Sequence, residues 1–125
     1  MLGNKNAVAN VAVKDLNTAR TFYQDTLGLT QVGGQDEELI VFRSGNSEVN
    51  VYRSQYAGTN QATAVTWVVG RDIESIVEKL KAKGVAFEHY DMPDMARDGD
   101  LHIFGDMKVA WFKDPDGNIL NIVNQ

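Results

Sequence analysis

The stretch that decides the fold is Ala7–Gly28, with the sequence AVANVAVKDLNTARTFYQDTLG. Its first part, Ala7–Lys14, is rich in valine and small residues, which is typical of a buried strand. Asp15 can then cap a helix, and apolar residues recur at three- and four-residue spacing through Thr18–Leu27. Gly28 follows as a stop signal. The stretch therefore predicts a strand that runs directly into a short amphipathic helix.

The same order recurs in the second half of the chain. A second strand candidate, Thr63–Val69 (TAVTWVV), precedes Asp72, and a stop signal follows at Gly84. The interval from cap to stop is nearly the same as in the first copy, and this helix also has one apolar stripe, formed by Ile73, Ile76, Val77 and Leu80. The chain is therefore predicted to contain an internal repeat.

Each helix is followed by strand candidates that are separated by turn signals. The strands are predicted at Leu29–Val32, Leu39–Arg43 and Glu48–Arg53 in the first half, and at Val85–His89, Leu101–Phe104, Val109–Lys113 and Ile119–Val123 in the second. Asp114-Pro115-Asp116-Gly117 is a strong turn signal, because Pro presets φ and Gly accepts positive φ. Tyr90–Asp100 is interpreted as a long loop or an irregular approach to a strand.

These patterns predict an α+β fold made of two βαβββ repeats. The halves are expected at residues 7–56 and 62–125, within a single domain that spans residues 1–125. The two repeats should form curved mixed sheets with the helices on their convex sides. Their concave sides are then free to enclose a ligand.

Composition narrows the classes of function. A chain of 125 residues with 43% hydrophobic content can bury one core, and the absence of cysteine excludes disulfides, a thiolate zinc site and a cysteine nucleophile. The net charge of −5 argues against nucleic acid, and either favours a cationic ligand or merely keeps the protein soluble. No apolar run is long enough for a membrane span, and Met1–Asn6 lacks the order of a secretion signal, so we expect a cytoplasmic protein.

Several motifs resemble one known family. They are Val13-Lys14-Asp15-Leu16, Ala19-Arg20-Thr21-Phe22-Tyr23, Leu27-Gly28-Leu29 and the run from Trp111 to Asn118, WFKDPDGN. In these motifs the chain resembles the vicinal oxygen chelate superfamily, which includes glyoxalase I, fosfomycin-resistance transferases, extradiol dioxygenases and bleomycin-binding proteins. The motifs cap a helix, pack a core and form a turn, so they indicate the fold and leave the chemistry open.

The resemblance implies four positions that hold a divalent metal ion in metal-dependent members. Counting from the motifs places Val8, Asn50, Ala64 and Asn121 at these positions. Val and Ala have no donor atom, and an Asn carbonyl is a neutral, weak ligand for zinc, nickel or iron. If the position on the strand Glu48–Arg53 is shifted by two residues from Asn50, Glu48 is the one carboxylate that could serve as a ligand. We therefore predict no metal ligands and no cofactor.

Strand alternation predicts which side chains share the concave side with these positions. Equal counting from a four-residue turn pairs Phe112 with Ile119, which would place Phe112 inward and Trp111 on the helix side, and a bulge would reverse this. Trp67 is expected in the core, with ligand stacking as the alternative. The amides of Asn50 and Asn121 would contact a ligand, or else bond each other or water. The predicted ligand contacts are Val8, Asn10, Asn50, Tyr52, Ala64, Thr66, Phe112 and Asn121.

The two histidines are the side chains that titrate near neutral pH. His102 precedes the strand at Val109 and is a tentative catalytic residue, as a general base at the rim of the site. His89 lies beside Glu88 and is expected at the surface. A purely structural role is the alternative for each histidine.

The sequence thus favours a glyoxalase- or bleomycin-resistance-like protein whose expected partner is a small organic molecule, bound without metal. The alternative is a lyase, isomerase or dioxygenase of the same superfamily, either metal-free through His102 or with metal ligands at other positions. Family dimers commonly share their sites between chains, so the resemblance implies a homodimer.

Overall fold

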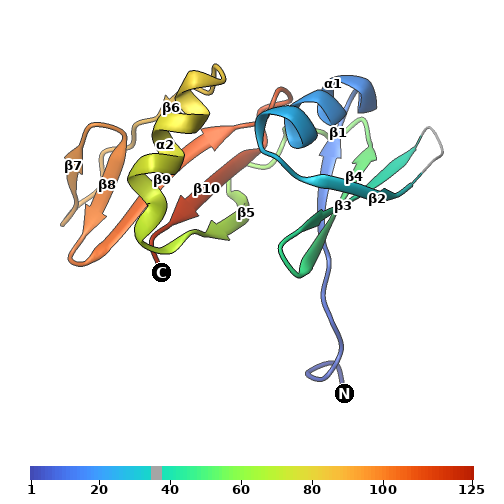
Figure 1. Cartoon of the computed structure of the whole chain (residues 1–125), viewed down its shortest axis with the longest axis horizontal. Helices are drawn as coiled ribbons and strands as arrows, with labels where there is room; N and C mark the ends of the chain where they lie inside the picture. The colour runs from blue at the N-terminus through green and yellow to red at the C-terminus, as the bar shows by residue number, and fades with distance from the viewer. Residues whose placement is uncertain (35–37) are drawn as a thin grey trace. The chain divides into compact units, whose positions relative to one another are not determined.

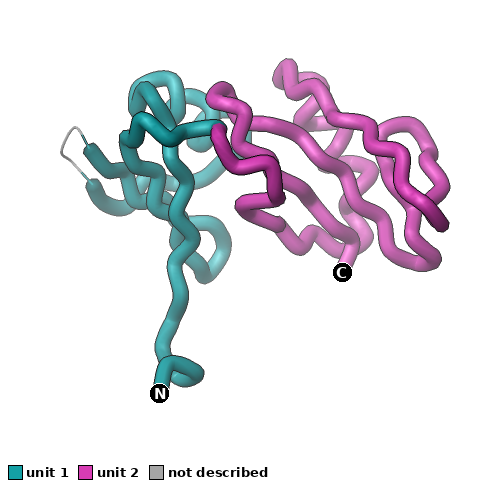
Figure 2. Tube along the Cα trace, turned by 180° about the vertical axis from the view of Figure 1, so that it is seen from behind, with its two compact units in different colours: residues 1–58 teal, residues 59–125 magenta. Residues whose placement is uncertain are grey.

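The computed structural model describes residues 1–34 and 38–125. The chain divides into two compact units, Met1–Gly58 and Thr59–Gln125, which are coloured separately in Figure 2. Each unit has its own sheet and its own helix (Figure 1). The units are therefore described one at a time.

The first unit contains a four-stranded sheet in the order β1-β4-β3-β2. Strand β1 runs parallel to β4, and the other neighbours are antiparallel. Because β1 and β4 are parallel, the helical segment serves as part of the crossover between them. The elements are β1 (Ala9–Val13), α1 (Leu16–Arg20), a π-helical turn η1 (Thr21–Thr26), β2 (Thr30–Gly33), β3 (Leu39–Ser44) and β4 (Ser47–Arg53).

Asp15 starts the helix of the first unit, as the sequence predicts. Its carboxylate accepts hydrogen bonds from the Asn17 backbone N–H at 3.0 Å and from the Thr18 hydroxyl at 2.8 Å. These hydrogen bonds lower the pKa of Asp15, the Thr18 bond most strongly. Gly28, at φ 84°, ends the segment in a conformation that favours glycine. The capping pattern was therefore a correct guide to the position of this helix.

One face of the first sheet is covered by the helical segment. Tyr23 is fully buried there, and its ring centroid lies 6.0 Å from that of Phe42. Alternate residues of the strands pack around this pair, because successive side chains of a strand point to opposite faces. The buried set includes Val11, Val13, Leu16, Ala19, Ile40, Val49 and Val51. The residues between them point to the opposite, open face.

The second unit contains six strands, in the order β5-β10-β9-β8-β7, with β6 also paired to β9. Strand β5 runs parallel to β10, which repeats the relation of β1 to β4. Helix α2 is the longest helix in the described chain, and Figure 1 shows it along one side of the sheet. The elements are β5 (Thr63–Val68), the 3-10 turn η2 (Gly70–Asp72), α2 (Ile73–Ala82), β6 (Phe87–Glu88), β7 (Ala96–Asp98), β8 (Leu101–Phe104), β9 (Met107–Lys113) and β10 (Ile119–Val123).

The fold class predicted from the sequence is confirmed, with one addition and one shortening in the second unit. The segment interpreted as a loop, Tyr90–Asp100, contains the short edge strand β7, which pairs Arg97 with His102 of β8. The strand predicted at Val85–His89 is reduced to β6. Strand β7 consists mainly of exposed charged residues. It therefore lacks the apolar pattern by which a strand is recognised in a sequence.

The register predicted for the last two strands is wrong by one residue. The connection has five residues, Asp114–Asn118, and Lys113 therefore pairs with Ile119, and Phe112 with Leu120. The buried Asp114 carboxylate holds this loop, because it accepts hydrogen bonds from the N–H groups of Asp116 and Asn118 at 3.0 and 2.9 Å, and from the Asn118 side chain at 2.8 Å. A one-residue shift exchanges the two faces of a strand.

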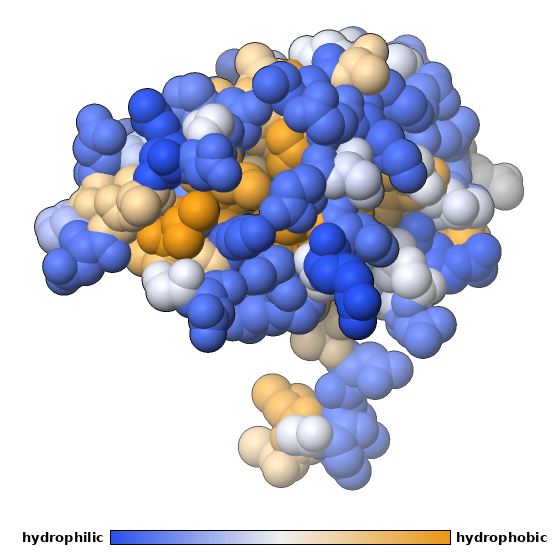
Figure 3. All heavy atoms as spheres, turned by 60° about the vertical axis from the view of Figure 1, so that its left-hand side comes forward, coloured by the Kyte–Doolittle hydropathy of each residue, from blue (hydrophilic) through white to orange (hydrophobic). Residues whose placement is uncertain are grey.

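As a result, Phe112 lies on the helix side and Trp111 on the open face, the reverse of the prediction. Phe112 is 1% exposed, and its ring centroid lies 6.4 Å from that of Trp67 and 5.8 Å from that of Phe87. The core role predicted for Trp67 is consistent with this stacking. Buried residues from α2, β9 and β10 complete the core: Ile73, Val77, Leu80, Ala110, Leu120 and Ile122. Hydrophobic side chains still reach the surface in patches among hydrophilic ones (Figure 3).

Candidate functional site

The open face of the first sheet carries the amides that the sequence predicted. Asn10 of β1 and Asn50 of β4 are register partners, and the Asn50 amide donates to the Asn10 side-chain oxygen at 3.3 Å. Asn10 in turn donates to the Val8 carbonyl at 3.3 Å. Asn50 therefore bonds a neighbour on its own sheet, an arrangement in which the two amides partly satisfy each other.

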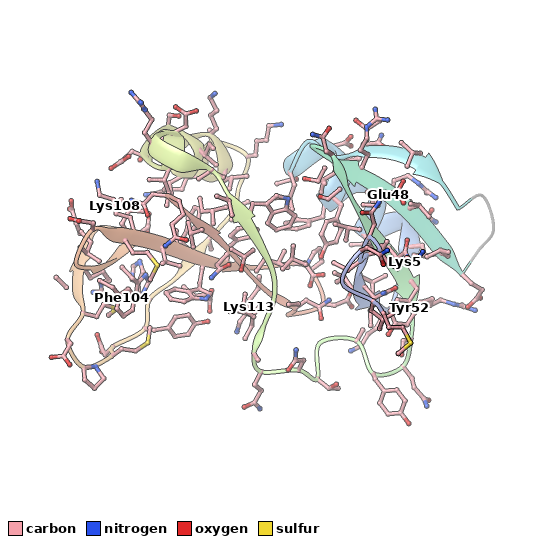
Figure 4. All side chains as sticks on the ribbon, turned by 90° about the horizontal axis from the view of Figure 1, so that it is seen from below. Lys5, Glu48, Tyr52, Phe104, Lys108 and Lys113 are labelled. Carbon is pink, nitrogen blue, oxygen red and sulfur yellow. The ribbon has the colours of Figure 1, made fainter. Side chains whose placement is uncertain are left out.

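Val8 and Tyr52 flank this amide pair. Val8 lies just before β1 and is 41% exposed, and Tyr52 of β4 is 39% exposed. Tyr52 is the register partner of Ala12 and Leu39, so it shares the open face with Asn50. Figure 4 labels Tyr52 and Glu48, both of β4, together with Lys5 of the N-terminal segment. The structure thus brings the predicted contacts of the first unit onto one face.

The face of the second sheet opposite Phe112 carries a row of side chains across four strands, and it shares that face with the buried residues Val109, Val123 and His102. Asn121 of β10 lies between Thr66 of β5 and Trp111 of β9, and Trp111 pairs with Glu88 of β6. Ala64 lies at a register shift between β5 and β10, where the pairing moves from Thr63 to Val65, so simple alternation does not assign its face. Glu88 is paired with Lys113 at 3.5 Å, so the centre of this row is uncharged. Lys113 lies at the opposite end of β9 from Lys108 (Figure 4).

Asn121 has an unusual environment in this row. The residue is 7% exposed, and its side-chain oxygen Oδ1 is buried without a hydrogen-bond donor among the described residues. Leaving a buried acceptor unpaired costs about 1–3 kcal/mol. Buried polar atoms without a partner are rare in folded proteins, and each one requires an explanation.

Trp111 is fixed in place beside Asn121. Its indole Nε1 donates to the Thr63 hydroxyl of β5 at 3.1 Å. Strand β10 lies between β9 and β5, so the indole must reach across β10. The rings of His102 and Tyr90 contact the indole nearly at right angles, with centroid distances of 4.9 and 5.3 Å. Trp111 is half-buried, so part of this rigid aromatic surface is exposed.

His102 is placed differently from its predicted position at a rim. It is a fully buried residue of β8, and its Nε2 accepts the backbone N–H of Tyr90 at 2.9 Å. Because Nε2 accepts, Nδ1 carries the proton and donates to the Val109 carbonyl at 3.3 Å. Both ring nitrogens are therefore used by the backbone. This geometry favours the structural role, and a catalytic role for His102 stays a prediction without support from its contacts.

Burial lowers the pKa of His102, because a buried imidazole loses hydration when it becomes charged. The hydrogen bond to Val109 acts in the opposite direction, and the nearby His89 and Arg97 lower the pKa further. Protonation would also place a hydrogen on Nε2, facing the Tyr90 N–H. The neutral form is therefore the form that the fold stabilises.

His89 is exposed, as predicted. Its Nε2 lies 2.8 Å from a carboxylate oxygen of Asp100, and Lys81 of α2 lies 2.9 Å from the other oxygen. The hydrogen bonds from His89 and then Lys81 lower the pKa of Asp100. This group ties α2 to the segment that precedes β8. We assign it a structural role.

We expect the free energy of unfolding to fall when the pH decreases below about 6.5. Below this pH, His102 is protonated in the unfolded chain but stays neutral in the folded chain. The free energy of unfolding therefore falls by up to about 1.4 kcal/mol per pH unit, until the pH reaches the lowered pKa of His102 in the folded chain. Above pH 6.5 this contribution is fully present. Urea denaturation at pH 7.5, 6.5 and 5.5 measures it.

The control for this experiment is His102→Gln, which removes the titrating group, with His89→Gln as a matched change at the exposed histidine. The slope should disappear in the first variant and persist in the second. Asp100 and the other carboxylates with lowered pKa change the free energy of unfolding only at more acidic pH. An unchanged slope in His102→Gln would contradict the assignment.

Of the four positions that the resemblance implies for a metal ion, two carry asparagine and two carry side chains without a donor atom. The latter are Val8 and Ala64; of the asparagines, Asn50 donates through its Nδ2 to the Asn10 side-chain oxygen at 3.3 Å. Across residues 1–34 and 38–125, no three side chains of His, Asp or Glu come together in a group that could hold a metal ion. Two neutral Asn carbonyls are poor ligands for a divalent transition metal.

The chain belongs to the Glyoxalase/Bleomycin resistance protein/Dioxygenase superfamily, whose family model matches residues 6–122. The resemblance seen in the sequence motifs is thereby confirmed. The search of the curated proteins gave no match. None of the helices that the structure describes has the length and apolar character that a membrane crossing requires.

Solved structures with the same fold cover nearly the whole chain. An integron cassette protein from the mobile metagenome of Halifax Harbour Sewage Outfall has a TM-score of 0.72 at 19% identity, over 98% of this chain and 99% of its own. The lactoylglutathione lyase of Agrobacterium tumefaciens has a TM-score of 0.72 at 16% identity, over 96% and 92%. The fosfomycin resistance protein FosX of Listeria monocytogenes has a TM-score of 0.69 at 15% identity, over 100% and 93%. At these identities the likeness establishes the fold alone.

Sequence reasoning missed the aromatic part of the second sheet's open face. Trp111 was expected on the helix side, and Tyr90 and Thr63 were not considered as its partners. The signal that could have found Trp111 is Asn118 at the end of the turn, because an Asp with an Asn four residues later can close a longer loop through side-chain hydrogen bonds. The contacts with Tyr90 and Thr63 depend on strand order and had no local signal.

Proposed function

We propose that this protein binds a small organic molecule at the face of the second sheet that carries Asn121 and Trp111, through Asn121 and without a metal ion. The observation that carries the proposal is the buried Oδ1 of Asn121, which has no donor among the described residues. A ligand that donates a hydrogen bond to this atom would remove the cost of leaving it unpaired. Thr66 and Trp111, its register partners, supply a hydroxyl and an aromatic surface.

The first unit offers its own, separate group of ligand contacts, which is also a proposal. Val8, Asn10, Asn50 and Tyr52 present two amides between exposed apolar surfaces. A few polar groups among apolar ones are the usual composition of a small-molecule site. Because Asn10 and Asn50 bond each other, their contribution to binding should be smaller than that of Asn121.

Protein purified without added ligand tests the proposal directly. We expect crystals to show ordered organic density with a donor within about 3.2 Å of Asn121 Oδ1. Native mass spectrometry should detect the same molecule, and Asn121→Leu should lose it. The matched control is Asn46→Leu, in the exposed turn between β3 and β4, which should retain it. A water molecule alone at Oδ1, with nothing bound in the spectrum, contradicts the proposal.

The stability of Asn121→Leu gives an independent readout. An unpaired buried acceptor kept for binding reduces the stability of the empty protein, so its replacement by an apolar side chain of similar shape should leave the free energy of unfolding unchanged or raise it by about 1 kcal/mol. Chemical denaturation of ligand-free protein measures this. A marked loss of stability would mean that Asn121 serves the fold.

Calorimetric titration tests the metal-free part of the proposal. Zinc, nickel, manganese and ferrous iron should each give no stoichiometric binding to the purified chain. A one-to-one event with submicromolar affinity that disappears in Asn50→Ala would contradict it. FosX, which shares the fold, was crystallised in complex with Mn(II) and 1S,2S-dihydroxypropylphosphonic acid, so its E126Q variant is a suitable positive control.

A homodimer and a cytoplasmic location stay predictions from the sequence. Size exclusion with light scattering measures the first, and a monomer at micromolar concentration would count against it.

A further inference from the structure

We infer that the site at Asn121 selects a neutral, planar molecule with an adjacent N–H and C=O on one edge, such as a lactam or a pyrimidinone. This inference rests on the proposed function and adds the chemical class of the ligand. It follows from three features of the same face: the Asn121 amide, the orientation of Trp111, and the absence of charge between them.

The first feature is the hydrogen-bonding pattern of Asn121. Its Oδ1 is an acceptor that no described residue satisfies, and its Nδ2 on the same amide is a donor. An amide group is therefore complementary to a ligand edge that offers one donor and one acceptor side by side. The same rule explains why Asn pairs with the adenine edge, which presents a donor beside an acceptor.

The second feature is the indole beside that amide. Trp111 is the register partner of Asn121, and residues directly opposite on antiparallel strands have Cβ atoms about 4.5–5.5 Å apart. The bond to Thr63 and the edge contacts with Tyr90 and His102 hold the ring in one orientation. A ligand bonded to Asn121 thus lies against a preorganised aromatic surface, and a flat ligand gains most from such a surface.

The third feature is the electrostatic neutrality of the row. Thr66, Asn121 and Trp111 carry no charge, and Glu88, the register partner of Trp111, forms an ion pair with Lys113 at 3.5 Å. Removing a charged ligand from water requires a compensating charge, which this row does not supply. A neutral ligand is therefore favoured over a carboxylate, a phosphate or an ammonium group.

The probe is 2-quinolone, a planar bicyclic lactam, compared with 1-methyl-2-quinolone, in which the N–H is replaced by a methyl group. Chemical shifts of the Trp111 indole N–H and the Asn121 side-chain amide report binding in the full chain. We expect 2-quinolone to shift both signals, and its methyl analogue to bind about tenfold more weakly, the loss expected for one hydrogen bond. Asn121→Leu should bind the two compounds equally weakly, and Asn46→Leu should bind them as the unaltered chain does.

The outcomes separate the ligand class from the proposed function. Equal binding of the two compounds, or binding unaffected by Asn121→Leu, overturns the class and leaves a binding site. Failure of both compounds to bind, while crystals hold an organic molecule at Asn121, also overturns the class alone. Failure of both compounds together with water alone at Oδ1 overturns the two proposals at once.

Discussion

Phe112→Ala should lower the free energy of unfolding by about 4 kcal/mol, the cost typical of removing a buried phenylalanine from a core. Phe112 is 1% exposed on the helix side of the second sheet, where it stacks with Trp67 and contacts Phe87. Removal of its ring leaves a cavity that neighbouring strands cannot close. Urea or guanidinium denaturation at neutral pH measures the change.

The matched control is Phe104→Ala, at a half-buried phenylalanine of β8 in the same sheet. Its loss should be smaller, about 1–2 kcal/mol, because less apolar surface returns to water. The register predicted from the sequence would place Phe112 on the open face and give the opposite result: weaker ligand binding with little loss of stability. A small stability change in Phe112→Ala would therefore reinstate that register.

Asp114→Ala should lower the free energy of unfolding by about 3 kcal/mol, because Asp114 stabilises the loop that sets the register between β9 and β10. Asp114 is 5% exposed, and its carboxylate accepts hydrogen bonds from the backbone N–H groups of Asp116 and Asn118 and from the Asn118 side chain. Hydrogen bonds to a charged group contribute about 1.5–3 kcal/mol each at most, and they act here as one network.

Two measurements distinguish loss of this network from a general effect of the substitution. Asp106→Ala changes an exposed aspartate in the turn between β8 and β9, and it should cost less than about 0.5 kcal/mol. Hydrogen exchange at the Asp116 and Asn118 amides should accelerate in Asp114→Ala more than exchange in the middle of β10. Equal losses in the two variants would contradict the role assigned to Asp114.

Local chemistry made the first helix predictable. Asp15 is followed by a Thr three residues later, and both the N–H of Asn17 and the hydroxyl of Thr18 bond its carboxylate. The apolar stripe of α2 likewise lies where its spacing placed it, with Ile73, Val77 and Leu80 buried. These features involve residues a few positions apart, so the sequence contains everything that is needed to infer them.

The candidate site was predicted only in part. Asn10, Asn50 and Tyr52 share a face because alternation along a strand is a local rule, whereas Ala64 lies at a register shift in β5 that the sequence did not show. The partner of Asn50 was not predictable, because Asn10 is forty residues away in sequence. The burial of His102 also escaped prediction, since Tyr90 bonds it from a segment that has no strand pattern.

By itself, the sequence determined most of the strands, the two helices, the repeat and the family, and it determined that the side chains of Val8 and Ala64 offer no donor atom to a metal ion. Only the tertiary structure decided that Trp111 faces outward beside Asn121 and that Phe112 faces the helix. The physical reason is the two-residue period of a strand: one extra residue in the loop closed by Asp114 exchanges the faces of β9 relative to the predicted pairing. The five-residue length of this loop is stabilised by side-chain hydrogen bonds that form only in the folded loop.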